Sequence, residues 1–160
     1  MIPNKIKPSI AVVDDEPTVV TGIKALLEHD EEFEVHGFTD PEETVQFAGS
    51  HPVDVVISDY RMPGTDGLQL LQRIRAIQPE SSRVLLTSPE DARSAMECIN
   101  SAALFQYLDK PLDSEQLLVA VRSGAERSRL LRDLREKVEE LDSAHGALKN
   151  VRKRLIDAFL

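Results

Sequence analysis

The chain has 160 residues, a formal net charge of −9 at pH 7 and a single cysteine, Cys98. This length predicts one domain with an appendage, and the acidic balance argues against direct nucleic-acid binding, which needs clustered Lys and Arg. One cysteine excludes an internal disulfide and is typical of a reducing compartment. No apolar run approaches the ~18–20 residues that cross a bilayer, and the start lacks a signal-peptide core. We therefore expect a cytoplasmic protein without membrane contact.

Short apolar runs alternate with amphipathic segments along residues 1–124. We predict strands at 9–13, 33–38, 53–58, 83–87 and 105–108, each followed by a helix. This alternation predicts an α/β fold, a doubly wound sheet of five parallel strands with helices on both faces.

Helix-start chemistry supports this assignment at several places. Pro17 suits a first helical position, and Asp40 is an N-cap before Pro41. Asp66 is expected to cap the third helix, with Gln69 at its third position. The run Ser88-Pro89-Glu90-Asp91 repeats the capping signature, so we expect Pro89 at the start of the fourth helix.

Polar side chains follow four of the predicted strands. The carboxyl ends of parallel strands share one rim, where ligands bind, so we expect these side chains to meet around one point. An oxygen-only set of three carboxylates tolerates its own charge only with a cation and selects a hard ion such as Mg²⁺. The residues are Asp14 and Asp15 after the first strand, Asp59 after the third, Thr87 ending the fourth and Lys110 after the fifth.

This set of residues is suited to accepting a phosphoryl group. With Mg²⁺ bound, the Asp59 carboxylate can attack phosphorus. Lys110 and the metal offset the charge on the phosphoryl oxygens, and Thr87 can donate to a third oxygen.

These residues lie in motifs that resemble the receiver domain of two-component response regulators, over roughly residues 7–124. The similar motifs are VVDDE at 12–16, DYRMPGTDG at 59–67, LLT at 85–87 and YLDKP at 107–111. The resemblance implies the flavodoxin-like strand order 2-1-3-4-5. It also implies that a sensor histidine kinase or a phosphotransfer protein phosphorylates Asp59, so that the chain is a signalling domain and not an enzyme.

The resemblance also implies roles for individual residues. Mg²⁺ is expected between Asp14, Asp15, Asp59 and the backbone carbonyl of Arg61, and the bond before Pro111 is expected to be cis. On phosphorylation the Thr87 hydroxyl moves inward and Tyr107 follows. Arg61 is expected to reach over the site and, with Pro89, to tune the lifetime of the phosphoryl group.

Residues 125–160 carry a repeat of their own. Positions 131, 134, 138, 141, 145, 148, 152, 155 and 159 follow 3–4 spacing, and seven of the nine are apolar. No proline follows Pro111, so we predict that the last helix continues unbroken into a parallel, homodimeric coiled coil. His145 and Arg152 at core positions weaken this dimer and fix its register, and Lys137 pairs with Asp142 across chains. We interpret the segment as a linker to an output domain; a solvated single helix is the alternative.

Two other functions stay open on the sequence. A Mg²⁺-dependent aspartate-nucleophile phosphohydrolase also has an acceptor Asp after a strand, but its Asp-x-Asp motif supplies a second acid to protonate the leaving group. Arg61 occupies that place here and cannot act as that acid. The other function is a phosphate-independent dimeric scaffold, against which the intact Asp59, Thr87 and Lys110 argue.

Overall fold

The structure is a computed structural model that describes the backbone of residues 6–159 and the side chains of 6–97 and 103–158. The start of the chain, where no signal peptide is predicted, and the Phe159 side chain lie outside the described residues. The main sheet has five parallel strands in the order β2-β1-β3-β6-β7, which confirms the predicted order. The strands are β1 (Ser9–Val13), β2 (Glu34–Phe38), β3 (Val55–Asp59), β6 (Ser82–Thr87) and β7 (Gln106–Asp109).

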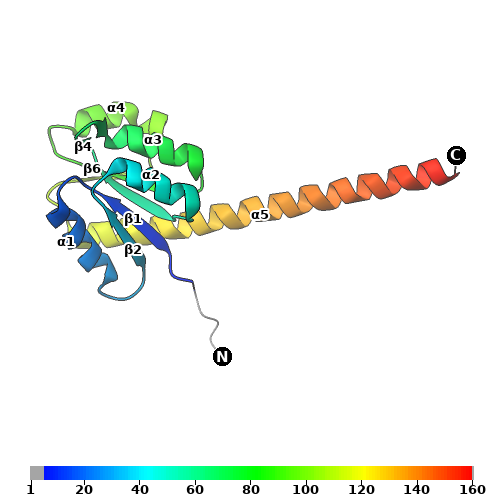
Figure 1. The fold of residues 1–160 in the computed structure, drawn as a ribbon, viewed down its shortest axis with the longest axis horizontal. Helices are drawn as coiled ribbons and strands as arrows, with labels where there is room; N and C mark the ends of the chain where they lie inside the picture. The colour runs from blue at the N-terminus through cyan, green and yellow to red at the C-terminus, as the bar shows by residue number, and fades with distance from the viewer. Residues whose placement is uncertain (1–5, 160) are drawn as a thin grey trace. The chain divides into compact units, whose positions relative to one another are not determined.

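Helices cover both faces of this sheet (Figure 1). One face packs against α1 (Pro17–Glu28) and the first turns of α5 (Ser114–Phe159). The other face packs against α2 (Pro41–Ser50), α3 (Gly67–Ile77) and α4 (Ala92–Ala102). The predicted doubly wound architecture is confirmed.

The central strands are apolar on both faces because each face has its own core. In β3, Ile57 belongs to the cluster on the α1 and α5 side, and Val56 belongs to the cluster on the α2, α3 and α4 side. Fully burying one such side chain contributes about 1.5–3 kcal/mol. The edge strand β2 is less buried: Glu34 is exposed, Val35 is buried in the cluster on the α1 and α5 side, and Phe38 is partly buried against the other cluster.

The starts of α2 and α3 follow their predicted caps. Asp40 accepts a hydrogen bond from the backbone N–H of Glu42 at 3.0 Å. The Gln69 N–H donates to Asp66 Oδ1 at 2.8 Å, within a full capping box. Each cap satisfies a backbone donor that the helix itself cannot satisfy.

The start of α4 differs from the prediction. Residues Ser88–Asp91 form a turn, closed by a hydrogen bond of 3.0 Å from the Asp91 N–H to the Ser88 carbonyl, and the helix begins only at Ala92. Pro89 is the second residue of this turn, a position that its fixed φ favours. The expectation that Pro89 opens the helix is therefore wrong.

A small hairpin that the sequence did not predict follows Asp59. It pairs β4 (Arg61–Met62) with β5 (Thr65–Asp66) in antiparallel fashion. Gly64 has a φ of +83° in the turn between them, a conformation that favours glycine. The hairpin returns the chain to Gly67, where a Cβ would collide with the backbone carbonyl of Asp59. Gly67 thus lets the first turn of α3 lie directly against the end of β3.

The chain divides into two compact units, residues 1–128 and 129–160. The first extends beyond the predicted boundary at residue 124 because Ala125 and Ser128 are also buried. The prediction of an unbroken last helix is confirmed, since α5 runs without interruption for 46 residues. Within the part of the chain that the structure describes, no helix is both long and apolar enough to span a bilayer.

We expect Gly67→Ala to lower the free energy of unfolding by about 1–3 kcal/mol, since the new methyl group must displace rigid backbone. The matched control is Gly22→Ala in α1, where an added Cβ meets nothing within 4 Å. That change should raise the free energy of unfolding by about 0.5–1 kcal/mol. Urea denaturation of both variants measures the contrast, and equal effects would contradict the close packing at Gly67.

Candidate functional site

The parallel register brings the predicted polar residues to one rim of the sheet. Asp59 ends β3 and Thr87 ends β6, while Asp14 directly follows β1 and Lys110 directly follows β7. Val13 lies opposite Ser58, and Asp59 lies opposite Leu86. Backbone pairing therefore sets the positions of Asp59 and Thr87 directly, and places the residues that follow β1 and β7 at the same rim.

Three carboxylates converge at this rim. Oxygen atoms of Asp14, Asp15 and Asp59 all lie within 4.8 Å of one another. Asp14 and Asp59 are buried, and Asp15 is exposed. The Oδ2 atom of Asp14 is buried and makes no hydrogen bond in the described structure. An unsatisfied carboxylate oxygen beside two further carboxylates, with no His or Cys ligand in the group, fits a hard divalent cation such as Mg²⁺.

The pKa of Asp14 is raised by its position in this cluster. Burial raises the pKa of Asp14 to about 6, and the charge of Asp59 adds to the rise. The backbone N–H of Glu16, which donates to Asp14 Oδ1 at 2.9 Å, opposes it. Without a cation, the folded state therefore binds a proton at Asp14 more tightly than the unfolded chain does.

Lys110 supplies a positive charge beside Asp59. Its Nζ lies 2.7 Å from Asp59 Oδ1 and 3.8 Å from Asp14 Oδ2. Burial acts against the charged ammonium, but the hydrogen bond and charge of Asp59 keep the pKa of Lys110 above its ordinary value. The Lys110 N–H donates to the Thr87 carbonyl at 2.8 Å, and the Lys110–Pro111 bond is cis.

Thr87 is fully buried, and its hydroxyl already has a partner. Oγ1 of Thr87 donates to Asp109 Oδ1 at 3.3 Å. Sequence reasoning missed Asp109, although its pairing opposite Thr87 follows from the β6–β7 register. Tyr107 is half-buried and packs against the apolar cluster that underlies α3 and α4, together with Tyr60.

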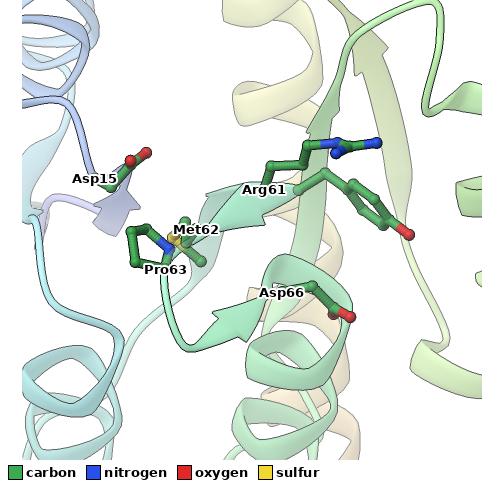
Figure 2. A pocket seen from close by; sticks show the side chains of 6 residues that line it. Asp15, Arg61, Met62, Pro63 and Asp66 are labelled. Carbon is green, nitrogen blue, oxygen red and sulfur yellow. The ribbon is translucent and has the colours of Figure 1, made fainter.

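Arg61 turns toward α4 in this structure rather than over the carboxylates. Its Nε lies 2.9 and 2.8 Å from the two carboxylate oxygens of Asp91, and its Nη2 lies 2.6 Å from Oδ1. Asp91 is buried and also accepts from Ser88 Oγ at 2.9 Å. The guanidinium holds the pKa of Asp91 below its ordinary value. Figure 2 shows Arg61 extending away from Asp15.

An open pocket of about 550 Å³ adjoins the carboxylate cluster (Figure 2). Asp15 belongs both to this pocket and to the cluster, so the cluster opens to solvent on this side. The pocket is lined by Asp15, Tyr60, Arg61, Met62, Pro63 and Asp66.

Curated proteins with similar sequences are regulators. The hydrogenase transcriptional regulatory protein HoxA of Cupriavidus necator is 30% identical over 141 residues, which cover 88% of this chain and 29% of that protein. The C4-dicarboxylate transport transcriptional regulatory protein DctD of Rhizobium meliloti is 31% identical, over 88% of this chain and 30% of its own length. The chain thus spans about three tenths of these relatives.

Solved structures resemble the chain over most of its length. One is described as an adenylate cyclase from Rhodopirellula baltica, with a TM-score of 0.78 and 30% identity over 84% of this chain and 98% of that one. Another is the signal receiver domain of an HD domain-containing protein from Pseudomonas fluorescens, with a TM-score of 0.74 and 30% identity over 83% and 98%.

The family comparison covers the whole rim. Residues 10–122 match the family described as the response regulator receiver domain. This range contains all three clustered carboxylates together with Thr87 and Lys110. Receiver domains of response regulators are signalling domains, and this chain belongs to the response regulator receiver domain family.

Proposed function

We propose that the chain accepts a phosphoryl group on Asp59, from a sensor histidine kinase or a phosphotransfer protein, in a Mg²⁺-dependent reaction. The observation that carries this proposal is the contact of the Asp59 carboxylate with an ammonium group inside a cluster of three carboxylates. Its Oδ1 lies 2.7 Å from Lys110 Nζ, which also lies 3.8 Å from Asp14 Oδ2, a buried oxygen without a hydrogen bond.

The chemistry assigns a distinct task to each residue. An Asp59 oxygen forms a bond to phosphorus as the donor's P–N bond breaks, which leaves an acyl phosphate on Asp59 and returns the electron pair to the donor nitrogen. Lys110 offsets the negative charge on the phosphoryl oxygens. Asp14, Asp15, Asp59 and the Arg61 carbonyl would hold Mg²⁺, which would supply Lewis-acid stabilisation when bound.

The relay is proposed to begin at Thr87. Its hydrogen bond to Asp109 is long at 3.3 Å, and a phosphoryl oxygen at Asp59 is a strong competing acceptor for the hydroxyl. The Thr87 hydroxyl then turns from Asp109 toward the phosphoryl group. Tyr107, which is half-buried two residues before Asp109 in β7, follows into the vacated space.

Arg61 and Pro89 are proposed to tune the phosphoryl lifetime through Asp91. The ion pair keeps the Arg61 guanidinium at the turn that precedes α4. Pro89 restricts that turn and so helps to hold Asp91 in place. Released from Asp91, the long Arg61 side chain can cover the route by which water reaches the acyl phosphate.

The segment after Ser128 is proposed to pair with a second copy of the chain in a parallel coiled coil and to link the receiver to an output domain. Leu134, Leu141, Leu148 and Leu155 recur at every seventh position, and each is more than half exposed. A straight helix drifts ~20° per heptad, so a seven-residue row stays on one seam only in a supercoil with another helix.

Incubation with Mg²⁺ and a phosphoramidate donor should place one phosphoryl group on Asp59, identified by mass spectrometry of the intact chain and its peptides. Asp59→Asn should abolish the modification. The matched control Asp30→Asn, in an exposed turn, should leave it unchanged.

Other outcomes of this experiment would identify the alternatives. Continuous release of phosphate with no accumulated acyl phosphate would favour the phosphohydrolase. A chain that stays unmodified while dimeric would favour the phosphate-independent scaffold.

The raised pKa of Asp14 predicts a pH-dependent stability in the metal-free protein. The folded state favours protonated Asp14, so this contribution to the free energy of unfolding is present below the unfolded-state value of 3.8 and is lost as the pH rises through about 6. Asp14→Asn, which stays neutral, should therefore be the more stable protein near neutral pH in EDTA. The two proteins should converge at about pH 4.

Urea denaturation at both pH values measures this difference, and addition of Mg²⁺ provides the second arm. Mg²⁺ should stabilise the wild type near neutral pH by mass action and stabilise Asp14→Asn much less. A difference between the two proteins that does not vary with pH would refute the assignment to Asp14.

Asp91→Asn should lengthen the phosphoryl half-life several-fold, because it removes the charge that holds Arg61 at the α4 turn. The effect should vanish in the Arg61→Ala/Asp91→Asn double variant, since no guanidinium is left to release. Glu90→Gln is the matched control for charge alone. Decay of the acyl phosphate, followed by mass spectrometry, measures the half-life; equal effects of Asp91→Asn with and without Arg61 would exclude this mechanism.

A further inference from the structure

Beyond Ser128, α5 carries one row of leucines flanked by two possible partner rows. The shared row is Leu134, Leu141, Leu148 and Leu155, every seventh residue. Each flanking row lies three or four residues from it, so either row can complete a coiled-coil seam. Row one consists of Leu131, Val138, His145, Arg152 and Phe159, and row two consists of Leu130, Lys137, Ala144, Val151 and Ala158.

The two flanking rows differ in which of them is apolar and which is charged, and this difference reverses halfway along the segment. Upstream of residue 142, row one offers Val138 where row two offers Lys137. Downstream, row one offers Arg152 where row two offers Val151. Val138 and Val151 are both about half exposed, at 47% and 52%. Where the two rows differ in charge, the exposed apolar side chain therefore belongs to row one upstream, at Val138, and to row two downstream, at Val151; Leu130 of row two is also exposed, at 55%.

We propose that a second copy of this chain packs against row one upstream of residues 143–146 and against row two downstream of them. This inference rests on the dimer of the proposed function and specifies its interface. It replaces the single continuous register predicted from the sequence. The core positions become 131, 134, 138 and 141, followed by 144, 148, 151, 155 and 158.

Burial of charge favours the change of face. A continuous row one places His145 and Arg152 in the core, and a continuous row two places Lys137 there. An unpaired charge in an apolar seam is costly, and the change of face moves all three side chains to the flanks. In the structure Lys137 already lies on the surface, 3.9 Å from Glu140.

The sequence at the change can accommodate it. Two successive three-residue steps, from 138 to 141 and from 141 to 144, amount to a three-residue insertion in the heptad pattern, which overwinds a coiled coil locally. The helical turn at this point consists of Ser143-Ala144-His145-Gly146. Gly146 has no packing partner within 4 Å that a Cβ would meet, and a glycine is the residue that tolerates altered backbone angles most readily.

Disulfide crosslinking of single-cysteine variants in a Cys98→Ser background tests the proposal. Two cysteines bridge only when their Cβ atoms come within roughly 4.5 Å, so the rate of crosslinking between copies identifies core positions. Val138→Cys and Val151→Cys should crosslink at least ten-fold faster than their neighbours Lys137→Cys and Arg152→Cys. Leu141→Cys and Leu148→Cys should crosslink in any parallel dimer and serve as positive controls.

Each other pattern has a distinct meaning. Fast crosslinking at 138 and 152 would restore the continuous row one, and at 137 and 151 would establish row two; either overturns the change of face but keeps the dimer. No crosslinking at 141 and 148 would instead overturn the proposed parallel dimer.

A second measurement is independent of disulfide chemistry. Val151→Ser should weaken dimerisation in sedimentation experiments at least ten-fold, whereas Arg152→Ser should leave it within about two-fold, an order-of-magnitude contrast expected for core and flank positions. A stronger effect of Arg152→Ser than of Val151→Ser would overturn the change of face.

Discussion

The burial of the Asp14 carboxylate next to two other carboxylates at one rim is the constraint on which the site depends. Asp14 keeps a buried oxygen without a hydrogen bond, and its raised pKa shows that the folded chain holds this charge at a cost. The positions are imposed by strand pairing and by apolar layers on both faces of the sheet. A rigid scaffold can hold groups that would otherwise move apart, and such unfavourable clusters are typical of functional sites. The energy of the two cores thus maintains a site that is ready for a cation.

Two carboxylates already bind the two side chains that a phosphoryl group at Asp59 would attract. Asp109 accepts from the Thr87 hydroxyl, and Asp91 binds the Arg61 guanidinium. The two contacts differ in strength, because the first is a single long hydrogen bond and the second is a bidentate ion pair with a buried carboxylate. In the proposed phosphorylated state, the anion at Asp59 would therefore compete more easily for Thr87 than for Arg61. The proposed relay would then begin with the Thr87 hydroxyl, while the ion pair with Asp91 would keep Arg61 in place.

Much of the fold and most of the rim could be predicted because their signals are local. The alternation of strands and helices and the caps at Asp40 and Asp66 lie within a few residues of what they control. The partners of Arg61 and Thr87 could not be predicted in the same way, since Asp91 lies 30 residues from Arg61 and Asp109 lies 22 residues from Thr87. The late start of α4 has the same origin. Pro89 matches a helix start locally. In the structure it lies in a turn instead, and this turn places Asp91 where its carboxylate accepts hydrogen bonds from both Ser88 and Arg61.

Strand β6 connects the rim to the helix that leaves the receiver unit. Thr87 ends the strand, and at its other end Ser82 Oγ donates to the Gly124 carbonyl of α5 at 2.7 Å. Gly124 lets the helix approach closely, because a Cβ there would lie 3.1 Å from the Ser82 side chain. A continuous helix carries any rotation at Gly124 along its axis, and neighbouring residues on a helix differ by about 100° around that axis. Rows one and two offer flanking residues one position apart, such as Val151 and Arg152. The change of face proposed at residues 143–146 uses this offset of one residue, because it lets a continuous helix move Arg152 out of the seam and Val151 into it.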